Sequence, residues 1–559
     1  MDGLYKLDYA THYGSYPYVD WGKVPDLEPR IPSLLAYCKA HRAAHELVVF
    51  DDDRLTYGQA VDQSALLARQ LLAAGIGKGS RVGMLFPNTP RFIVTWLAIA
   101  RIGAVSVPIS TLSSAPELRR ILRHADVQLL ITADRYLNHD YVARLADAVP
   151  GLAGQTGAIR LTAAPYLRAV WIWGDNLPSW ARGIDLDQAN PDYDDALLAA
   201  VESEVVASDP VSVIYTSGST AEPKGVVHSH GNFMRESAKL VACSFPPFNP
   251  EDRVFTQMPF FWVGGLTMNL LNLMHRGATC IGSSRTGAAL LDLLQRERVT
   301  YMVSWPHLAR ALAADPSFAA REFPAMRAGN LYEALPPALR PKDPGLIGTA
   351  LGMTETCGPH RAEQRELTAD LRGSFGRPMP GMQHRVIDPD TGADVAPGDV
   401  GLLLVRGDTL MLGLVKCESI DVFDADGWYR TGDAVSLRDG HFFFHGRLDD
   451  MIKTAGANVS PAEVEGVLAK LPGVVQPFVF SIPDPRRGAV VGAVVVVAPG
   501  TEISADGLRT LVARELSAYK VPRALLILRP AELPMASSGK ADRKRMRKLL
   551  ADAYLSTDT

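Results

Sequence analysis

Short apolar runs alternate with helical stretches from about residue 32 onward, and this pattern constrains the fold more than any other feature of the chain. The run RVGMLF at 81–86, for example, is followed by a helical stretch that opens at Pro90 and closes at Gly103. Such alternation is typical of βα units that feed a mostly parallel sheet. We therefore predict an α/β fold whose large N-terminal domain consists of doubly wound subdomains.

The pattern changes twice further along the chain. Residues 151–210 are less regular and rich in Asp, Ala and Pro, so we predict a connecting surface segment that carries no chemistry. After about residue 375, short strands are separated by Gly and Asp turns. That spacing predicts a small antiparallel or β-barrel-like unit.

A new packing unit begins with the stretch SPAEVEGVLAKLPG. Ser460 is a predicted helix N-cap, with Glu463 as its capping-box partner and Pro461 at the first helical position. Val464, Val467, Leu468 and Leu471 then fall on one face, which predicts an amphipathic helix.

The order beyond this helix predicts strands within 477–498, a helix over 504–518 and a strand over 523–529. We place a boundary near residue 449. The predicted domains are 1–448 and a smaller, mobile α+β domain over 449–559.

Composition excludes several functions. The 559 residues carry a net charge of −4, which gives no global field to attract nucleic acid or an anionic membrane. The first residues lack the basic start and apolar run of a secretion signal, and the longest apolar run, 489–498, is about half as long as a membrane-spanning helix. We predict a cytoplasmic protein without integral membrane association, and a buried strand at 489–498.

The five cysteines are scattered and form no CxxC pair. Neither a disulfide framework nor a zinc site is therefore expected. We expect a small-molecule partner and no nucleic acid, and a homodimer is left open.

The stretch YTSGSTAEPKG at 215–225 begins at the last residue of the apolar run VSVIY at 211–215. Its glycines allow close backbone approach, successive N–H groups form an anion-binding nest, and Ser and Thr hydroxyls add donors. Lys224 adds a positive charge that Glu222 partly offsets. Neither GxxxxGK[ST] nor GxGxxG is present. Taken alone, the loop fits either a polyphosphate site or a polar turn between two strands.

Four further stretches accompany this loop: LGMTE at 351–355, GWYRTGD ending at Asp433, GRLDDMIKTAGANVSPAEVE at 446–465, and SSGKADR with Lys540. In this order, over roughly residues 30 to 545, the five stretches resemble those of the adenylate-forming superfamily. That superfamily contains acyl-CoA synthetases, adenylation domains of peptide synthetases and luciferases. The resemblance implies that ATP converts a carboxylic acid to an acyl adenylate with release of pyrophosphate, and that a thiol then displaces AMP.

The resemblance also implies a nucleotide site. The residues that would hold the β- and γ-phosphates are Thr216, Ser217, Gly218, Ser219, Thr220 and Lys224. Glu355, together with Thr216, would contact Mg²⁺, since hard oxygen ligands suit that ion, and Thr354 would touch the α-phosphate.

Two further residues are assigned to the ribose. Asp433 would accept hydrogen bonds from both ribose hydroxyls. Arg447 would be a second ribose or phosphate contact. The alternatives are a turn carboxylate at Asp433 and a local ion pair at Arg447.

The resemblance implies three catalytic residues, namely Lys540, Thr354 and Glu355, and gives Asp449 and Gly456 of the second domain other roles. The Lys540 ammonium would reach oxygens of the carboxylate and α-phosphate, where charge builds in the adenylation transition state. Asp449 would be the hinge about which the C-terminal domain rotates between half-reactions. The backbone near Gly456 would line the pantetheine tunnel. No carrier domain follows Lys540, so we expect coenzyme A as the acceptor.

The adenine site departs from the family pattern. Leu351 stands where a tyrosine often stacks on adenine, beside Gly352 and Met353 of the same stretch. The segment AGNLYEALPP at 328–337 replaces a glycine-rich one; in it Asn330 would still address the adenine edge, while Leu331 and Tyr332 would alter the pocket shape.

The predicted acid pocket comprises Phe261, Trp262, Val263, Gly264, Leu331 and Tyr332. The alternative for Trp262 is an ordinary core tryptophan. The apolar residues, with no buried cation or carboxylate at a motif position, predict a hydrophobic or aromatic carboxylic acid.

Three other functions are alternatives to an acyl-CoA synthetase. One is an acyl-AMP ligase that loads a separate carrier protein, and another is a catalytically silent nucleotide-binding homologue. A serine hydrolase is disfavoured because no GxSxG elbow is present. His228 and His230 are expected to cap or pack rather than to bind metal.

Overall fold

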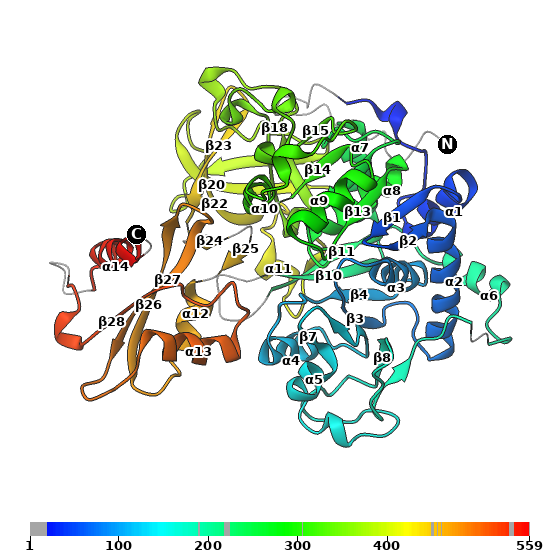
Figure 1. Cartoon of the computed structure of the whole chain (residues 1–559), viewed down its shortest axis with the longest axis horizontal. Helices are drawn as coiled ribbons and strands as arrows, with labels where there is room; N and C mark the ends of the chain where they lie inside the picture. The colour runs from blue at the N-terminus through cyan, green and yellow to red at the C-terminus, as the bar shows by residue number, and fades with distance from the viewer. Residues whose placement is uncertain are drawn as a thin grey trace.

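The computed structural model describes residues 19–187, 190–216, 224–304, 306–448, 452–454, 457–459, 461–535 and 541–557. Figure 1 shows a larger body, coloured blue to yellow, and a smaller orange-to-red body beside it. We call them the large unit and the C-terminal unit.

An eight-stranded sheet runs through the large unit in the order β21-β11-β10-β4-β3-β5-β8-β9. It is parallel from β10 to β9 and antiparallel at β11 and β21. The strands are β3 (Arg81–Leu85), β4 (Val105–Pro108), β5 (Leu129–Ala133), β8 (Ala169–Trp173), β9 (Arg182–Gly183), β10 (Pro210–Thr216), β11 (Lys224–Ser229) and β21 (Gly413–Leu414).

A six-stranded sheet has the order β15-β14-β12-β13-β1-β2 and is parallel except at β2. Its strands are β1 (Glu46–Phe50), β2 (Asp53–Thr56), β12 (Arg253–Thr256), β13 (Thr279–Gly282), β14 (Tyr301–Val303) and β15 (Ala328–Gly329).

Helices cover the two sheets. They are α1 (Ile31–Arg42), α2 (Tyr57–Ala73), α3 (Pro90–Arg101), α4 (Ala115–His124), α5 (Tyr141–Ala148), α6 (Asp195–Ser203), α7 (His230–Ala242), α8 (Asn272–Arg276), α9 (Gly287–Arg296) and α10 (Pro306–Ala313). Helix α3 is buried from Phe92 to Arg101, and its core cluster also holds strand residues of both sheets, such as Val48 and Met84. The predicted doubly wound architecture is confirmed, including the helix that opens at Pro90.

Smaller sheets complete the large unit. An antiparallel sheet contains β19 (Met382–Ile387), β20 (Val400–Gly407), β22 (Tyr429–Arg438) and β23 (His441–Arg447). Three further strands pair as β16 (Ala350–Met353), β17 (Gly358–Ala362) and β18 (Arg377–Pro378). Short elements are β6 (Arg135–Tyr136), β7 (His139–Asp140) and α11 (Ser419–Val422). The antiparallel unit predicted after residue 375 is confirmed.

The expectation for residues 151–210 is wrong in part. The run AVWIW forms β8, which lies in the eight-stranded sheet beside β5, with Val170, Trp171 and Ile172 buried. The eight-stranded sheet therefore contains a strand that was not predicted. The reason is that a run of only five apolar residues between polar turns gives a weak strand signal.

The C-terminal unit contains β24 (Ile452–Thr454), β25 (Ala457–Val459), α12 (Pro461–Leu468), β26 (Val474–Asp484), β27 (Gly488–Val497), α13 (Ala505–Glu515), β28 (Ala524–Leu528) and α14 (Arg543–Thr557). The predicted helices and strands of this region are confirmed, and the predicted strand at 489–498 forms most of β27, in which residues 490–497 are buried. Ser460 and the boundary at 449 lie outside the described residues.

The hydrophobic clusters of the C-terminal unit contain only its own residues, from Ile452 to Tyr554. The clusters of the large unit contain none of them. Each unit therefore has its own core over the described ranges. In those ranges, no helix is long and apolar enough to cross a bilayer.

Candidate functional site

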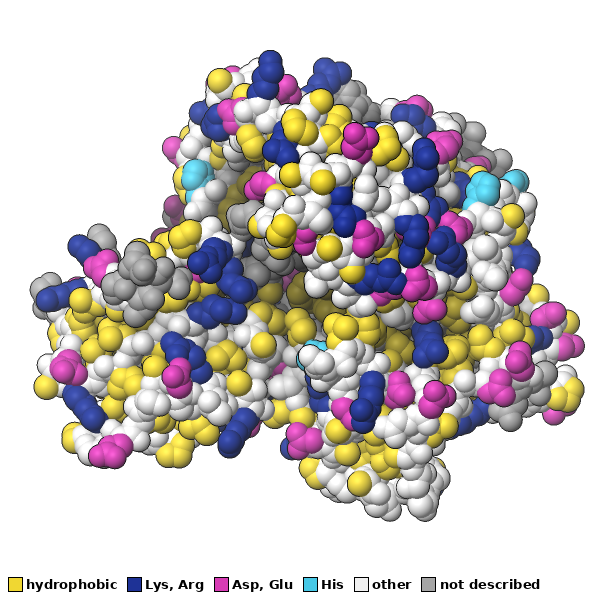
Figure 2. Space-filling view, in the orientation of Figure 1, with side chains coloured by type: hydrophobic (Ala, Val, Ile, Leu, Met, Phe, Trp, Pro, Cys, Tyr) yellow, Lys and Arg dark blue, Asp and Glu magenta, His cyan; other side chains and the backbone are white. Residues whose placement is uncertain are grey.

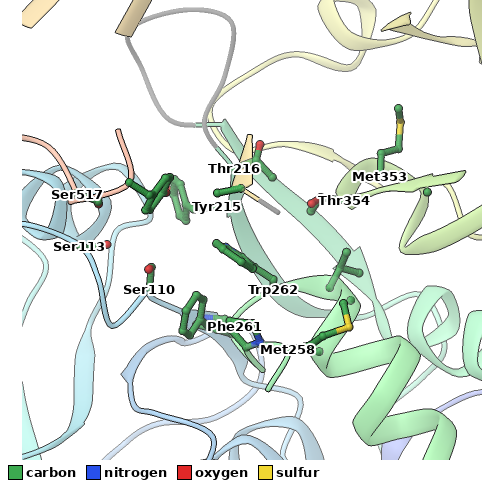
Figure 3. Close-up of a pocket in the computed structure, with 18 of the residues that line it drawn as sticks. Ser110, Ser113, Tyr215, Thr216, Met258, Phe261, Trp262, Met353, Thr354 and Ser517 are labelled. Atoms are coloured by element: carbon green, nitrogen blue, oxygen red, sulfur yellow. The ribbon is translucent and has the colours of Figure 1, made fainter. Parts of the chain in front are cut away.

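A cavity of about 450 Å³ lies where the two units meet, and it is lined by residues from both. Figure 2 shows hydrophobic side chains gathered in the hollow between the smaller body on the left and the larger one. Figure 3 shows the labelled side chains around this space, with Phe261 and Trp262 in the middle and Ser517 of the C-terminal unit on the side opposite Met353.

One end of the cavity, which we call the aromatic end, is formed by Phe261, Trp262 and neighbouring methionines such as Met258 and Met268. The Phe261 and Trp262 rings meet edge to face, with centroids 5.3 Å apart and planes at 74°, an arrangement that aromatic pairs favour. Val263 and Gly264 line the same cavity. All four predicted pocket residues of this stretch are thus brought together.

The π-helix η3 (Gly264–Leu271) follows directly and fixes this stretch. A side chain at Gly265 could not be accommodated, because its Cβ would lie 2.0 Å from the carbonyl oxygen of Pro259. The Thr267 hydroxyl is within hydrogen-bonding distance of the carbonyls of Val263 and Cys357. The rings are therefore held by backbone that has little room to shift.

The predicted phosphate loop joins two antiparallel strands. Thr216 ends β10 and is the register partner of Lys224, the first residue of β11. Thr216 lines the cavity, as does Tyr215, whose hydroxyl lies 2.7 Å from His124 Nδ1. Ser217, Gly218, Ser219 and Thr220 lie outside the described residues.

The stretch LGMTE brings three of its members to the cavity, namely Gly352, Met353 and Thr354. His228 lies behind it, with Nε2 2.7 Å from the carbonyl oxygen of Thr354. Because a carbonyl only accepts, that nitrogen carries the proton. Burial lowers the pKa of His228 to about 4 and that of His230 to about 3, so both rings are neutral near pH 7 and pack in the interior, as expected.

Glu355 does not line the cavity. Its carboxylate accepts a hydrogen bond of 3.1 Å from the Tyr429 hydroxyl. No cluster of three or more His, Cys, Asp or Glu residues suited to a metal is found over the described ranges. A protein-only metal cage is not what Mg²⁺ needs, because this ion usually takes one or two carboxylates with substrate phosphates and waters. The oxygen donors of Glu355 and Thr216 fit that requirement.

Two predicted nucleotide residues, Asn330 and Leu351, and two predicted acid-pocket residues, Leu331 and Tyr332, lie away from this cavity. Asn330 uses its side-chain oxygen to accept a hydrogen bond of 3.0 Å from the Ser304 N–H. Leu331 is fully buried and packs, with the partly buried Tyr332, in the cluster around α9. Leu351 belongs to the core cluster beneath the antiparallel sheet. The structure therefore does not bring these four residues to the cavity that holds Trp262.

The ribose candidates lie on the antiparallel sheet. Asp433 is buried on β22, and its register partner on β23 is Arg447. The Arg447 side chain lies outside what the structure describes, as do Asp449, Gly456 and Lys540.

The other end of the cavity is charged, and sequence reasoning missed it. The Lys520 ammonium lies 3.0 Å from Glu117 of α4 and 2.9 Å from Glu463 of α12. Ser517 donates a hydrogen bond to the second oxygen of Glu117. Each of these residues lines the cavity.

Burial and charge compete in this group. Burial would raise the pKa of Glu117, but the Lys520 ammonium and the Ser517 hydroxyl outweigh it and hold the pKa below its usual value. Burial raises the pKa of Glu463, and Lys520 offsets this only in part. Burial alone would lower the pKa of Lys520, but its neighbours Tyr519, Glu117 and Glu463 raise it. Lys520 therefore stays charged, and Glu117 is the carboxylate that balances it across the two units.

Comparison with known proteins identifies the family. Residues 36–415 match the model of the AMP-binding enzyme family, and residues 463–540 match that of the AMP-binding enzyme C-terminal domain. The chain belongs to the AMP-binding enzyme family. The resemblance to adenylate-forming enzymes inferred from the motifs is thereby confirmed.

Relatives cover nearly the whole chain. It is 31% identical over 493 residues to a feruloyl-CoA synthase of an Amycolatopsis species, covering 87% of this chain and 92% of the relative. It is 29% identical over 510 residues to an indoleacetate–CoA ligase of Aromatoleum aromaticum, covering 90% and 94%. Among solved structures, the amide bond synthetase McbA from Marinactinospora thermotolerans superposes with a TM-score of 0.75 at 25% identity, covering 92% and 99%.

Proposed function

We propose that this enzyme activates a hydrophobic or aromatic carboxylic acid with ATP and transfers the acyl group to coenzyme A, as an AMP-forming acid–CoA ligase. One observation carries the proposal: Thr216 and Thr354, from two predicted nucleotide motifs, line the same cavity as the Phe261–Trp262 pair. The relatives named as CoA synthases and ligases support the same reading.

The aromatic end suits an apolar acid. Phe261 is almost fully buried and Trp262 is partly buried, so an aromatic or alkyl group placed against them would lose contact with water, which favours binding. The charged residues that line the cavity come from α4 and the C-terminal unit and lie outside this stretch. An acid with a charged tail would therefore find no buried partner at the aromatic end.

Two steps convert the acid. In the first, a carboxylate oxygen attacks the α-phosphorus of ATP and pyrophosphate leaves with the bonding electrons. In the second, the thiol sulfur attacks the acyl carbonyl, AMP leaves with the bridging oxygen, and the thiol proton goes to solvent. Mg²⁺, held through Glu355 and the phosphates, would neutralise phosphate charge in the first step.

The remaining roles follow the motif assignments. Lys224 and the loop before it would hold the outer phosphates, Asp433 and Arg447 the ribose, and Lys540 the charge that develops during adenylation. Asp449 would be the hinge at the 448/449 boundary. We place the reaction in the cytoplasm, without a nucleic-acid partner.

A product assay over a panel of acids tests this function. The purified chain is incubated with ATP, Mg²⁺, CoA and aryl, alicyclic or fatty acids, and acyl-CoA, AMP and pyrophosphate are measured together. We expect equal amounts of the three products with at least one hydrophobic acid. A parallel reaction replaces CoA with a phosphopantetheinylated carrier protein. Transfer to the carrier alone would contradict the CoA assignment, and absence of AMP with every acid would contradict acid activation.

A further inference from the structure

The contact between the two units is polar and local. Hydrogen bonds join the two units at Ser114 and Glu117, at the N-terminal end of α4. The Ser114 hydroxyl donates to the carbonyl of Glu515 at 2.8 Å, at the end of α13. Figure 1 shows α13 and α4 facing each other where the two bodies meet. We call Ser114, Glu117, Ser517 and Lys520 the polar latch.

Charges on both sides of the latch also have partners within their own unit. Glu117 caps its own helix, because its carboxylate accepts a hydrogen bond of 2.8 Å from the Ser114 N–H. On the other side, the Lys520 ammonium has an ion pair within the C-terminal unit, with Glu463 at 2.9 Å. If the units separated, neither charge would be left buried without a partner, which is the situation that makes breaking a buried ion pair so costly. The latch is therefore suited to open and close.

The cores on either side do not oppose separation. The hydrophobic clusters of the two units share no residue over the described ranges. Apart from the latch, the Lys453 ammonium lies 4.3 Å from the Phe444 ring centroid. An interface held mainly by a few polar contacts is typical of units that move relative to each other.

The two ends of the cavity depend on the latch to different degrees. Phe261, Trp262, Thr216 and Thr354 belong to the large unit, so the acid and nucleotide positions need no docked C-terminal unit for their walls. The opposite wall includes Ala457, Ser517 and Tyr519 of the C-terminal unit. A thiol that reaches the acyl carbonyl from between the units must pass this wall, and its path exists in this form only while the latch is closed.

We infer that Glu117 is a positioning residue for the thiol-transfer step: through Lys520 and Ser517 it holds the C-terminal unit against α4 in the arrangement that shapes the acceptor's path. The inference rests on the proposed function. It assigns no chemical role to Glu117, which acts through the placement of its partners.

The test separates the two half-reactions in Glu117→Gln. Glutamine keeps the helix cap, since Gln also serves at this position of a capping box, but removes the charge that faces Lys520. Transfer from preformed acyl adenylate to CoA should fall about tenfold, in the range of coupling between contacting residues, while acid-dependent pyrophosphate–ATP exchange stays within about twofold. In the double variant Glu117→Gln/Lys520→Gln, the fold-loss in transfer should be smaller than the product of the fold-losses in the two single variants, because both remove the same contact.

Glu297→Gln is the matched control. Glu297 is also a buried glutamate and pairs with Arg54 and Arg253 at 2.6 Å each, but wholly inside the large unit. This variant should not separate the half-reactions. If Glu117→Gln leaves transfer unchanged, or lowers both half-reactions equally as Glu297→Gln could through stability, the positioning role is overturned.

Hydrogen exchange gives a readout that does not depend on activity. Glu117→Gln should speed exchange at 515–521, where the Lys520 N–H is bonded to the Ser517 carbonyl, and leave the core strands 477–497 protected. Unchanged exchange at 515–521 would overturn the latch even if the enzyme is active. If the wild-type chain shows no pyrophosphate exchange with any acid, the proposed function fails, and this measurement still decides the latch.

Discussion

The aromatic end of the cavity and its charged end are assembled differently. The aromatic end comes from one stretch of the large unit, fixed by the π-helix that begins at Gly264. The charged end forms only where α4 meets the C-terminal unit, from residues 403 positions apart in sequence. A rigid apolar wall can select a substrate, because its shape is set before binding. A charged wall between two units can instead govern when a second substrate is admitted.

The same difference appears in two buried glutamates. Glu236 of α7 is fully buried; burial raises its pKa to about 8, and Lys239 only partly offsets this. Glu117 is also buried, but Lys520 across the interface outweighs burial. One carboxyl is therefore held neutral inside a unit, while the other is held charged between units.

The largest effect on activity is expected from a substitution at Lys540. This result would show that the large unit does not by itself supply every residue needed for adenylation. Lys540 belongs to the C-terminal sequence, yet we propose that it serves adenylation. Lys540→Ala should lower acid-dependent pyrophosphate exchange by on the order of 10² or more, as loss of a transition-state charge contact does. Transfer from supplied acyl adenylate should suffer much less. Equal losses in both assays would contradict separate roles for Lys540 and Glu117.

A smaller effect on binding is expected at the aromatic end. Trp262→Ala should raise the KM for an aromatic acid by about tenfold, because an edge-to-face ring contact and buried apolar area are lost. The KM for ATP should hardly change. Trp173→Ala, which removes a half-buried tryptophan of β8 that does not line the cavity, is the matched control. A rise in KM for ATP as large as that for the acid would place Trp262 at the nucleotide instead.

The two glutamates also predict a dependence of stability on pH. Because the pKa of Glu236 is about 8 in the folded chain against an ordinary 4.5, the folded state binds its proton more tightly. The contribution of this group is therefore full below about pH 4.5 and is lost as pH rises toward 8, by on the order of a few kcal/mol.

Glu236→Gln should flatten this decline, and denaturant titrations at pH 6 and pH 9 would measure it. Glu117 has a lowered pKa, so its contribution is present above its ordinary pKa and is lost as pH falls. If the free energy of unfolding of Glu236→Gln fell as steeply between pH 6 and pH 9 as that of the wild type, the claim that the Glu236 carboxyl is neutral in the folded chain would be contradicted.

The smallest effect is expected at a thiol away from both ends. Cys417 is exposed, whereas Cys38, Cys243, Cys280 and Cys357 are buried. Burial raises the pKa of Cys38, Cys243 and Cys280 to about 12, which disfavours the reactive thiolate. A colorimetric thiol reagent should therefore modify one cysteine rapidly in the folded chain, without loss of adenylation. Rapid reaction of a second thiol, or inactivation, would contradict this arrangement.

The sequence predicted the features that depend on local pattern. Alternating apolar runs gave the parallel sheets, and the PFFWVGG stretch gave the aromatic end, because neighbouring residues of one turn reach the same wall. In the structure, Ser114 and Glu117 form a capping box at the start of α4. It explains Glu117 fully as a helix cap, however, and so conceals its second role.

Features that depend on distant contacts were not predictable from the sequence. Nothing in the stretch AYKVPR at 518–523 indicates that the Lys520 ammonium meets α4. Leu331 was predicted for the acid pocket, but it packs in the cluster around α9. Asn330 and Leu351 were assigned to the nucleotide by motif position, but each lies away from the cavity that holds Trp262. Their roles toward adenine stay predictions. Glu236 gave no signal at all, since its burial follows from the packing of α7 against other elements.

Acid-dependent exchange of labelled pyrophosphate into ATP, measured without CoA, tests the central claim most directly, because only a reversible acyl adenylate produces it. The account predicts exchange with a hydrophobic or aromatic acid, none without acid, and a rate that survives Glu117→Gln. Exchange that required CoA, or its absence with every acid while ATP still bound, would contradict the claim that this cavity activates a carboxylic acid.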